Sequence, residues 1–112
     1  MEIRPMQRKD LSQLADLYCQ FWGEESNLEK MNRQFDRLAA DDTHLLLCAV
    51  EGERLLGSVT GILCEDLYGD CRPFLLVENM VVDQNCRRKG IGRLLLAALE
   101  EQAKRRSCVQ ML

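Results

Sequence analysis

Arg87-Arg88-Lys89-Gly90-Ile91-Gly92-Arg93 is the stretch that best indicates how the chain folds. It lies between an apolar run typical of a β-strand and a long amphipathic pattern typical of a helix, and four of its seven side chains are cationic. Glycine lets a backbone approach a ligand closely, and the first N–H groups of a helix lack partners within the helix and favour anions. The stretch therefore predicts a phosphate-binding loop at a helix N-terminus, with a turn of solvated basic residues as the alternative.

Two widespread phosphate-binding motifs are absent from the chain. It has no G-x-x-x-x-G-K-[ST] sequence, which excludes a P-loop, and it lacks the third glycine and the later acidic residue of the G-x-G-x-x-G dinucleotide fingerprint. What remains is R-x-x-G-x-G at Arg87–Gly92, shortly after the strand-like run Leu75–Asp83.

This strand, loop and helix together resemble the acetyl-CoA motif, Q/R-x-x-G-x-G/A, of the GNAT superfamily of N-acetyltransferases. The resemblance implies an enzyme that uses acetyl-CoA as co-substrate and acetylates a primary amine by direct attack. It also implies a bulge in the preceding strand, beside which the backbone of Met80, Val81 and Val82 binds the pantetheine arm. The residues implied to hold the diphosphate are Arg87, Arg88, Lys89, Gly90, Ile91, Gly92 and Arg93.

Glu78 is the candidate catalytic residue. A carboxylate within an apolar strand is costly to bury unless it is paired or solvated, and a protonated amine must lose its proton before it attacks. The resemblance implies that Glu78 is the general base, directly or through water. The alternatives are a glutamate that caps the sheet and an ion pair with a neighbouring arginine. Asn79 is the second choice as a polar contact, although strand alternation turns it to the other face unless a bulge intervenes.

Hydrophobic periodicity and turn signals predict the remaining elements. Asp10 is the expected N-cap of a first helix that ends at Gly23, and Ser26 with Glu29 is the expected capping box of a second. The first helix is expected to bury Leu11, Leu14, Ala15, Tyr18, Phe21 and Trp22, and the last to bury Leu94, Leu95, Ala98, Leu99 and Ala103. The predicted strands are Ile3–Met6, His44–Val50, Leu55–Cys64 and Phe74–Val82, and a further strand begins at Cys108–Leu112.

The element order β-α-α-β-β-β-α-β matches the N-terminal two-thirds of the GNAT fold. The resemblance implies an α/β fold of the α+β kind, with a mixed, mostly antiparallel central sheet flanked by helices. We expect residues 1–112 to form a single domain that lacks the C-terminal part of that fold. A truncated GNAT-like module that binds coenzyme A or a partner chain without catalysis is the alternative function.

Composition narrows the class of protein. The chain has 112 residues and a formal charge of −3, which argues against general nucleic-acid binding. It has no apolar run that could cross a bilayer, so we expect a cytoplasmic protein with no membrane partner. The six cysteines are irregularly spaced and there is one histidine, which predicts reduced thiols and no metal site.

The acceptor is the part that the sequence defines least. The resemblance places the acceptor pocket beside the turn between the first two helices, where Trp22, Glu24 and Glu25 suit a cationic amine. Solvated acidic loops have the same composition, so this assignment stays open. The expected partner is a small-molecule amine or a peptide amine, and the resemblance is compatible with a homodimer.

Overall fold

The computed structural model describes residues 1–112 and contains one four-stranded antiparallel sheet. The strands lie side by side in chain order, as β1 (Glu2–Pro5), β2 (His44–Glu51), β3 (Arg54–Cys64) and β4 (Phe74–Val82). The predicted hairpin between β2 and β3 is confirmed, with Gly52 in the turn at a φ of 60°. Val109–Leu112 begins a parallel pairing with the start of β4, through a bridge between Leu75 and Met111.

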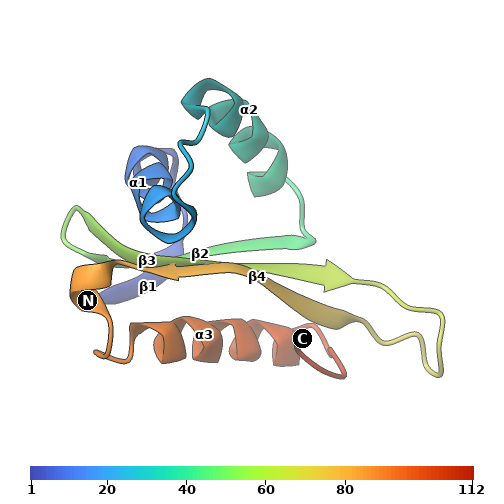
Figure 1. Cartoon of the computed structure of the whole chain (residues 1–112). Coiled ribbons are helices and arrows are strands. Elements are labelled where there is room, and N and C mark those ends of the chain that lie inside the picture. The colour runs from blue at the N-terminus through green and yellow to red at the C-terminus, as the bar shows by residue number, and fades with distance from the viewer.

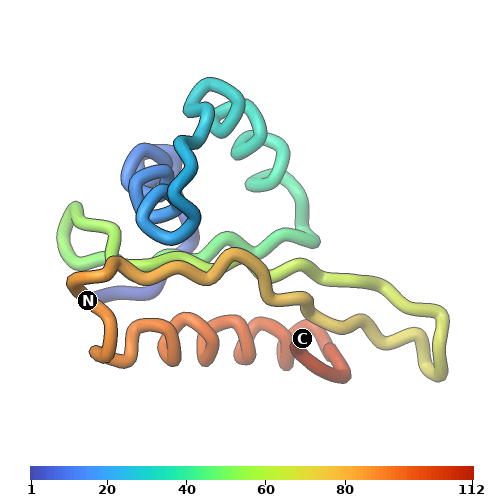
Figure 2. Tube along the Cα trace, viewed as in Figure 1, coloured from blue at the N-terminus to red at the C-terminus, as the bar shows by residue number.

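Three helices cover the two faces of the sheet (Figure 1). α1 (Leu11–Trp22) and α2 (Leu28–Ala39) lie on one face, and α3 (Ile91–Arg105) runs along the other. The trace in Figure 2 shows the same three layers, with the chain turning back towards the sheet after α3. The predicted fold class and element order are therefore confirmed.

Each face of the sheet has its own core. Leu95 and Leu99 of α3 are fully buried against Leu75 and Val59 of the sheet. On the other face, α1 packs onto Cys48, Val50, Leu55 and Val81. β4 contributes to both cores, because Leu75 faces α3 and Val81 faces α1.

The two predicted helix N-caps have different outcomes. Asp10 is the N-cap residue of α1 by position, but its carboxylate makes no cap hydrogen bond, because it binds Arg4 and the Gln7 N–H instead. The capping box predicted at Ser26 and Glu29 is wrong. The N-cap of α2 is Asn27, whose side chain accepts a 3.0 Å hydrogen bond from the N–H of Lys30. The predicted end of α1 is correct, since Gly23 takes a φ of 73° and donates to the Cys19 carbonyl.

The predicted buried faces are partly wrong. α1 buries Leu17, which the prediction missed, whereas Phe21 and Trp22 are 54% and 52% exposed. In α3, Leu94 is 45% exposed, although Leu95, Leu99 and Ala103 are buried as predicted. Phe21 and Trp22 lie in the last turn of α1, whereas Leu94 lies outside the stripe of Ile91, Leu95, Leu99 and Ala103 that packs on the sheet.

Two further observations concern the whole chain. None of the helices combines the length and the apolar character needed to cross a lipid bilayer. All six cysteines are free, and they range from buried Cys48 and Cys86 to exposed Cys19 and Cys71.

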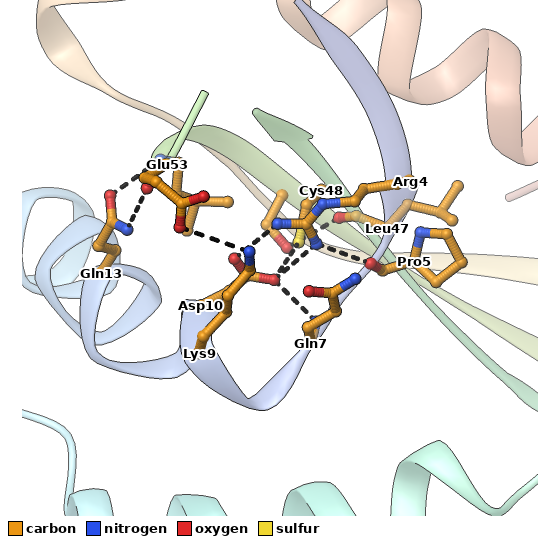
Figure 3. Close-up of polar contacts among 11 residues, drawn as sticks. Arg4, Pro5, Gln7, Lys9, Asp10, Gln13, Leu47, Cys48 and Glu53 are labelled. Carbon is orange, nitrogen blue, oxygen red and sulfur yellow. Dashed lines mark hydrogen bonds and ion pairs between the residues drawn. The ribbon is translucent and has the colours of Figure 1, made fainter. Parts of the chain in front are cut away.

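A buried ion pair ties β1 to the start of α1 (Figure 3). The guanidinium of Arg4 donates two hydrogen bonds, of 2.8 and 2.9 Å, to the carboxylate of Asp10, which is 2% exposed. The same carboxylate accepts a 2.7 Å hydrogen bond from the Gln7 N–H and lies 3.8 Å from the Cys48 thiol. The pair therefore fixes the chain reversal that leads from the sheet edge into α1.

The environment of this pair shifts two pKa values in opposite directions. Burial opposes the negative charge of Asp10, but the hydrogen bonds from Arg4 and Gln7 outweigh it and lower the pKa of the carboxyl. Burial, with the nearby charge of Asp10, raises the pKa of Cys48 to about 12. Cys48 is therefore an uncharged packing residue at neutral pH.

Replacing Asp10 should destabilise the protein strongly. Asp10→Asn leaves Arg4 buried without its counter-charge, a change that typically lowers the free energy of unfolding by about 3–5 kcal/mol. Because the folded pKa of Asp10 is lowered, the difference from wild type should be complete above about pH 4 and shrink at lower pH. Urea unfolding measured from pH 3 to pH 7 checks both statements.

The matched control is Glu53→Gln, which removes the exposed ion pair between Lys9 and Glu53, 3.4 Å long. It should change stability by less than about 1 kcal/mol. Equal effects of the two substitutions would contradict the importance of the buried pair.

Candidate active site

A β-bulge in β4 organises the site. Val81 pairs with Ser58 and Glu78 pairs with Thr60, so Asn79 and Met80 both lie opposite Val59. Asn79 takes a φ of 52°, which is unusual for a residue with a side chain. One extra residue in one strand is the defining feature of a bulge.

The bulge changes which residues share a face of the sheet. Glu78 and Asn79 line the same cavity on the face covered by α1 and α2. Asn79 was expected on the other face unless a bulge intervened, and the bulge is present. Beyond it, Val81 is buried against α1 and Val82 packs against the α3 core. Met80 faces α3, where its thioether approaches Gly92.

The predicted phosphate loop leads directly into α3. Gly90 is the N-cap, with a φ of 78°, and Arg88 also has a positive φ, of 69°. The first hydrogen bond of the helix runs from the Leu94 N–H to the Gly90 carbonyl, at 3.1 Å. The N–H groups of residues 91–93 therefore have no partner in the chain, as expected for a helix start.

A cavity of about 380 Å³ lies against this loop. Its lining contains most of the predicted cofactor residues: Val82, Arg87, Arg88, Gly90, Ile91, Gly92 and Arg93, together with Cys86. Lys89 does not line it but faces an adjoining cavity beside Cys86 and Arg54. Arg87 donates a 3.4 Å hydrogen bond from Nε to the Val82 carbonyl, so its side chain braces the loop against β4.

Gly90 and Gly92 differ in whether the backbone conformation itself favours glycine. Gly90 has a backbone conformation that other residues rarely adopt. Gly92 is helical, and a Cβ there would meet only the Met80 side chain, at an ordinary 3.7 Å. Nothing in the protein itself requires glycine at position 92, so the open space suits a ligand that touches the backbone. Free N–H groups, arginines and this space together fit the diphosphate of coenzyme A.

A second hollow lies on the opposite face of the sheet. A cavity of about 530 Å³ is lined by Tyr18, Asn79 and the predicted acceptor residues Trp22, Glu24 and Glu25. It adjoins a cavity of about 500 Å³ whose wall includes Glu78. The residues common to both are Tyr18, Met31, Gln34 and Asn79. The bulged part of β4 thus faces these cavities.

Glu78 is solvated rather than buried. Its side chain is exposed and makes no hydrogen bond or ion pair, so the alternative of a pair with a neighbouring arginine is not observed. A carboxylate without a partner, on a cavity wall, is free to accept a proton from a bound molecule.

Sequence reasoning missed several residues of the cavity walls, including Tyr18, Gln34, Thr60 and His44. Burial raises the pKa of Tyr18, so its hydroxyl remains a hydrogen-bond donor at neutral pH. His44 is held through Nδ1, 3.3 Å from Asp41 and 3.2 Å from the Thr43 hydroxyl. These residues come from α1, α2, β2 and β3, and no local motif links them. No group of three or more histidine, cysteine, aspartate or glutamate side chains is placed to hold a metal ion.

Comparison with known protein families decides the identity of this fold. The model of the acetyltransferase (GNAT) family matches residues 11–112. The chain belongs to the GNAT acetyltransferase family. No curated protein matches this GNAT chain at a significant level.

Solved GNAT structures share the fold at low sequence identity. A putative acetyltransferase from Agrobacterium tumefaciens superimposes with a TM-score of 0.91 at 22% identity, over 100% of this chain and 79% of that one. Glucosamine-6-phosphate N-acetyltransferase from Arabidopsis thaliana gives 0.89 at 20% identity, over 99% and 79%. An aminoglycoside 6'-N-acetyltransferase from Acinetobacter haemolyticus gives 0.81 at 20% identity, over 99% and 77%.

Substitution of Gly92 should separate ligand binding from folding. Gly92→Leu places a side chain in the space beside the free N–H groups, and we expect affinity for coenzyme A to fall about tenfold or more. Stability should be kept or increased, because leucine favours a helix over glycine by roughly 0.5–1 kcal/mol. Isothermal titration calorimetry with coenzyme A and thermal unfolding measure the two effects.

Ala97→Leu is the control, since it adds the same side chain to an exposed position of α3. It should leave coenzyme A affinity unchanged. Wild-type affinity in Gly92→Leu would show that the diphosphate lies elsewhere.

Proposed function

We propose that this GNAT chain transfers the acetyl group of acetyl-CoA to a primary amine by direct attack. One observation carries the proposal: Glu78, directly before the bulge in β4, lies on the wall of the cavity beside α1 and α2, and the same strand leads into the phosphate loop at α3. The site for a thioester carrier and the site for a proton acceptor thus meet on a single strand. Holding both reactants in line supplies much of the acceleration in such reactions.

The phosphate loop is the proposed binding site of the coenzyme A diphosphate. The N–H groups at the start of α3 donate to its oxygens, and the helix dipole favours its negative charge. Arg88 and Arg93 line the same cavity and add positive charge. Arg87 acts mainly by holding the loop against the Val82 carbonyl.

The backbone of β4 is the proposed guide for the pantetheine arm. The N–H groups of Leu75 and Val77 are taken by Gln110 and Leu112, whereas no strand of this chain lies along the same edge from Met80 to Val82. The Asp83 N–H donates to Leu56 in β3, so strand alternation turns the Val82 N–H towards the open edge. An N–H there can stabilise the negative charge that develops on the thioester oxygen.

Glu78 is the proposed proton acceptor. A primary amine is protonated at neutral pH and becomes a nucleophile only when the proton is removed. The neutral nitrogen then forms a bond to the acetyl carbon and loses its second proton to water. The carbon–sulfur bond breaks, and the coenzyme A thiolate leaves and takes up a proton from the solvent. Glu78, directly or through one water molecule, receives the proton that the amine loses before attack.

Removal of the Glu78 charge should lower turnover while coenzyme A binding remains. Glu78→Gln keeps the shape of the side chain but cannot accept the proton, and loss of such a group typically lowers kcat by about 10²–10⁴-fold. Thiol release from acetyl-CoA in the presence of a primary amine measures the effect.

Glu100→Gln, on the exposed side of α3, is the control and should leave kcat unchanged. If Glu78→Gln turns over at the wild-type rate, another group removes the proton. If wild-type protein binds coenzyme A but acetylates no amine, the non-catalytic alternative is correct.

The acidic turn after α1 should assist capture of the cationic amine. Glu24 and Glu25 line the cavity next to the bulge and are exposed, so each contributes a modest, screened attraction. We expect Glu24→Gln with Glu25→Gln to raise KM for the amine by a few-fold at low salt and less at high salt. An unchanged KM at low salt would exclude the turn from the acceptor site.

A further inference from the structure

The apolar side of α2 is packed only incompletely against α1 and the sheet. α2 has no buried residue, although its sequence is strongly amphipathic. Met31, Phe35 and Leu38 are only half-buried, and all three line the cavity of about 500 Å³. In Figure 1, α2 lies beside α1 above the sheet. The cavity is lined by residues of α1, α2 and the sheet. A helix normally buries such a stripe completely, so this one has room for an apolar occupant.

The opposite wall of the cavity is also apolar. It is formed by residues of α1 and of the sheet: Leu11, Leu14, Leu46 and Ile62, with Met6 after β1. Nine of its fourteen lining residues are hydrophobic. A volume of this size, with mainly apolar walls and a few polar groups, is typical of sites for small organic molecules.

The polar groups of this cavity are unevenly distributed. Glu78 and Asn79 lie on adjacent positions of the bulged strand, and Asn79 also lines the cavity bounded by Glu24 and Glu25. We call the cavity of about 530 Å³ the outer cavity and the cavity of about 500 Å³ the inner cavity. Lys30 lines the outer cavity, and the inner cavity is lined by no lysine or arginine. A molecule that places one cationic group near Glu78 therefore meets apolar surface further in.

We propose that the acceptor is a primary amine that carries an apolar alkyl or aryl arm. The amine lies beside Glu78, and the arm fills the cavity between α2 and the sheet. This proposal rests on the proposed acetyltransferase function and specifies its substrate class. A second charge at the far end of the arm is disfavoured, because the apolar walls offer it no partner and burial of an unpaired charge is costly. At that end His44 can offer only Nε2, since Nδ1 already contacts Asp41 and Thr43.

A matched pair of amines tests the proposal with the chain of residues 1–112. n-Hexylamine and 1,6-diaminohexane have the same carbon chain and differ in the second amine. We expect kcat/KM for hexylamine, from thiol release with acetyl-CoA, to exceed that for the diamine about tenfold or more. Calorimetric titration in the absence of acetyl-CoA should show the same preference in binding. Equal or better use of the diamine overturns the proposal, because it places the arm towards the acidic turn instead.

A cavity-filling variant locates the arm. Leu38→Trp adds bulk to the wall of the inner cavity from the half-buried side of α2. The ratio of kcat/KM for hexylamine to that for ethylamine should fall about tenfold, since only the longer amine reaches this wall. Arg37→Trp adds the same side chain to an exposed position one residue away and should leave the ratio unchanged. An unchanged ratio in Leu38→Trp overturns the proposal.

Two further outcomes are distinguishable. If hexylamine binding is lost as the protein concentration rises, a second copy of the chain occupies the cavity instead of the amine. That result overturns the proposal. If acetyl-CoA binds and the diamine alone is acetylated, the substrate class is wrong but the acetyltransferase function stands. If acetyl-CoA does not bind to wild-type protein, the proposed function itself fails.

Discussion

The extra residue in β4 is the constraint on which the rest of the site depends. Side chains alternate along a strand, so one inserted residue reverses the facing of everything beyond it. With the bulge, Glu78 faces the cavities and Val81 still reaches the α1 core. Without it, Val81 would turn to the α3 core and Val82 away from it. The core on each face therefore fixes the bulge, and the bulge places two polar residues together where strict alternation allows one.

Backbone strain is concentrated around the same strand. Asn79 and Arg88 are two of the four non-glycine residues with a positive φ, and Gly90 adds a third left-handed position before α3. Such conformations persist only where the surrounding structure holds them. The buried residues Val81 and Cys86 anchor the chain between these points, and Arg87 braces the loop from outside. The same contacts that hold the strained backbone therefore leave the N–H groups at the helix start unpaired.

The features that were predicted correctly from the sequence are turns and helix ends, which depend on residues adjacent in the chain. The helix start at Gly90, the hairpin turn at Gly52 and the end of α1 at Gly23 each follow from a few adjacent side chains, and the structure has all three. Asp10 does precede α1, but its carboxylate does not cap the helix because Arg4 of β1 competes for it, which no local pattern reveals. The cavity walls were missed for the same reason. Tyr18, Gln34 and Thr60 come from three elements and meet only when the sheet and helices assemble.

The distribution of packing explains how one small chain can combine a stable sheet with an adaptable site. α1 and α3 each bury leucines in a closed core, and the Arg4–Asp10 pair fixes the entry into α1. α2 has no fully buried residue and contributes only the half-buried Met31 and Phe35 to the margin of the α1 core. Elements with few buried contacts open or shift at low free-energy cost. Because α2 forms one wall of the inner cavity, that wall can adjust to an occupant without disturbing β4. β4, which carries Glu78, is thereby held between two closed cores, whereas the proposed acceptor surface on α2 is only half-buried.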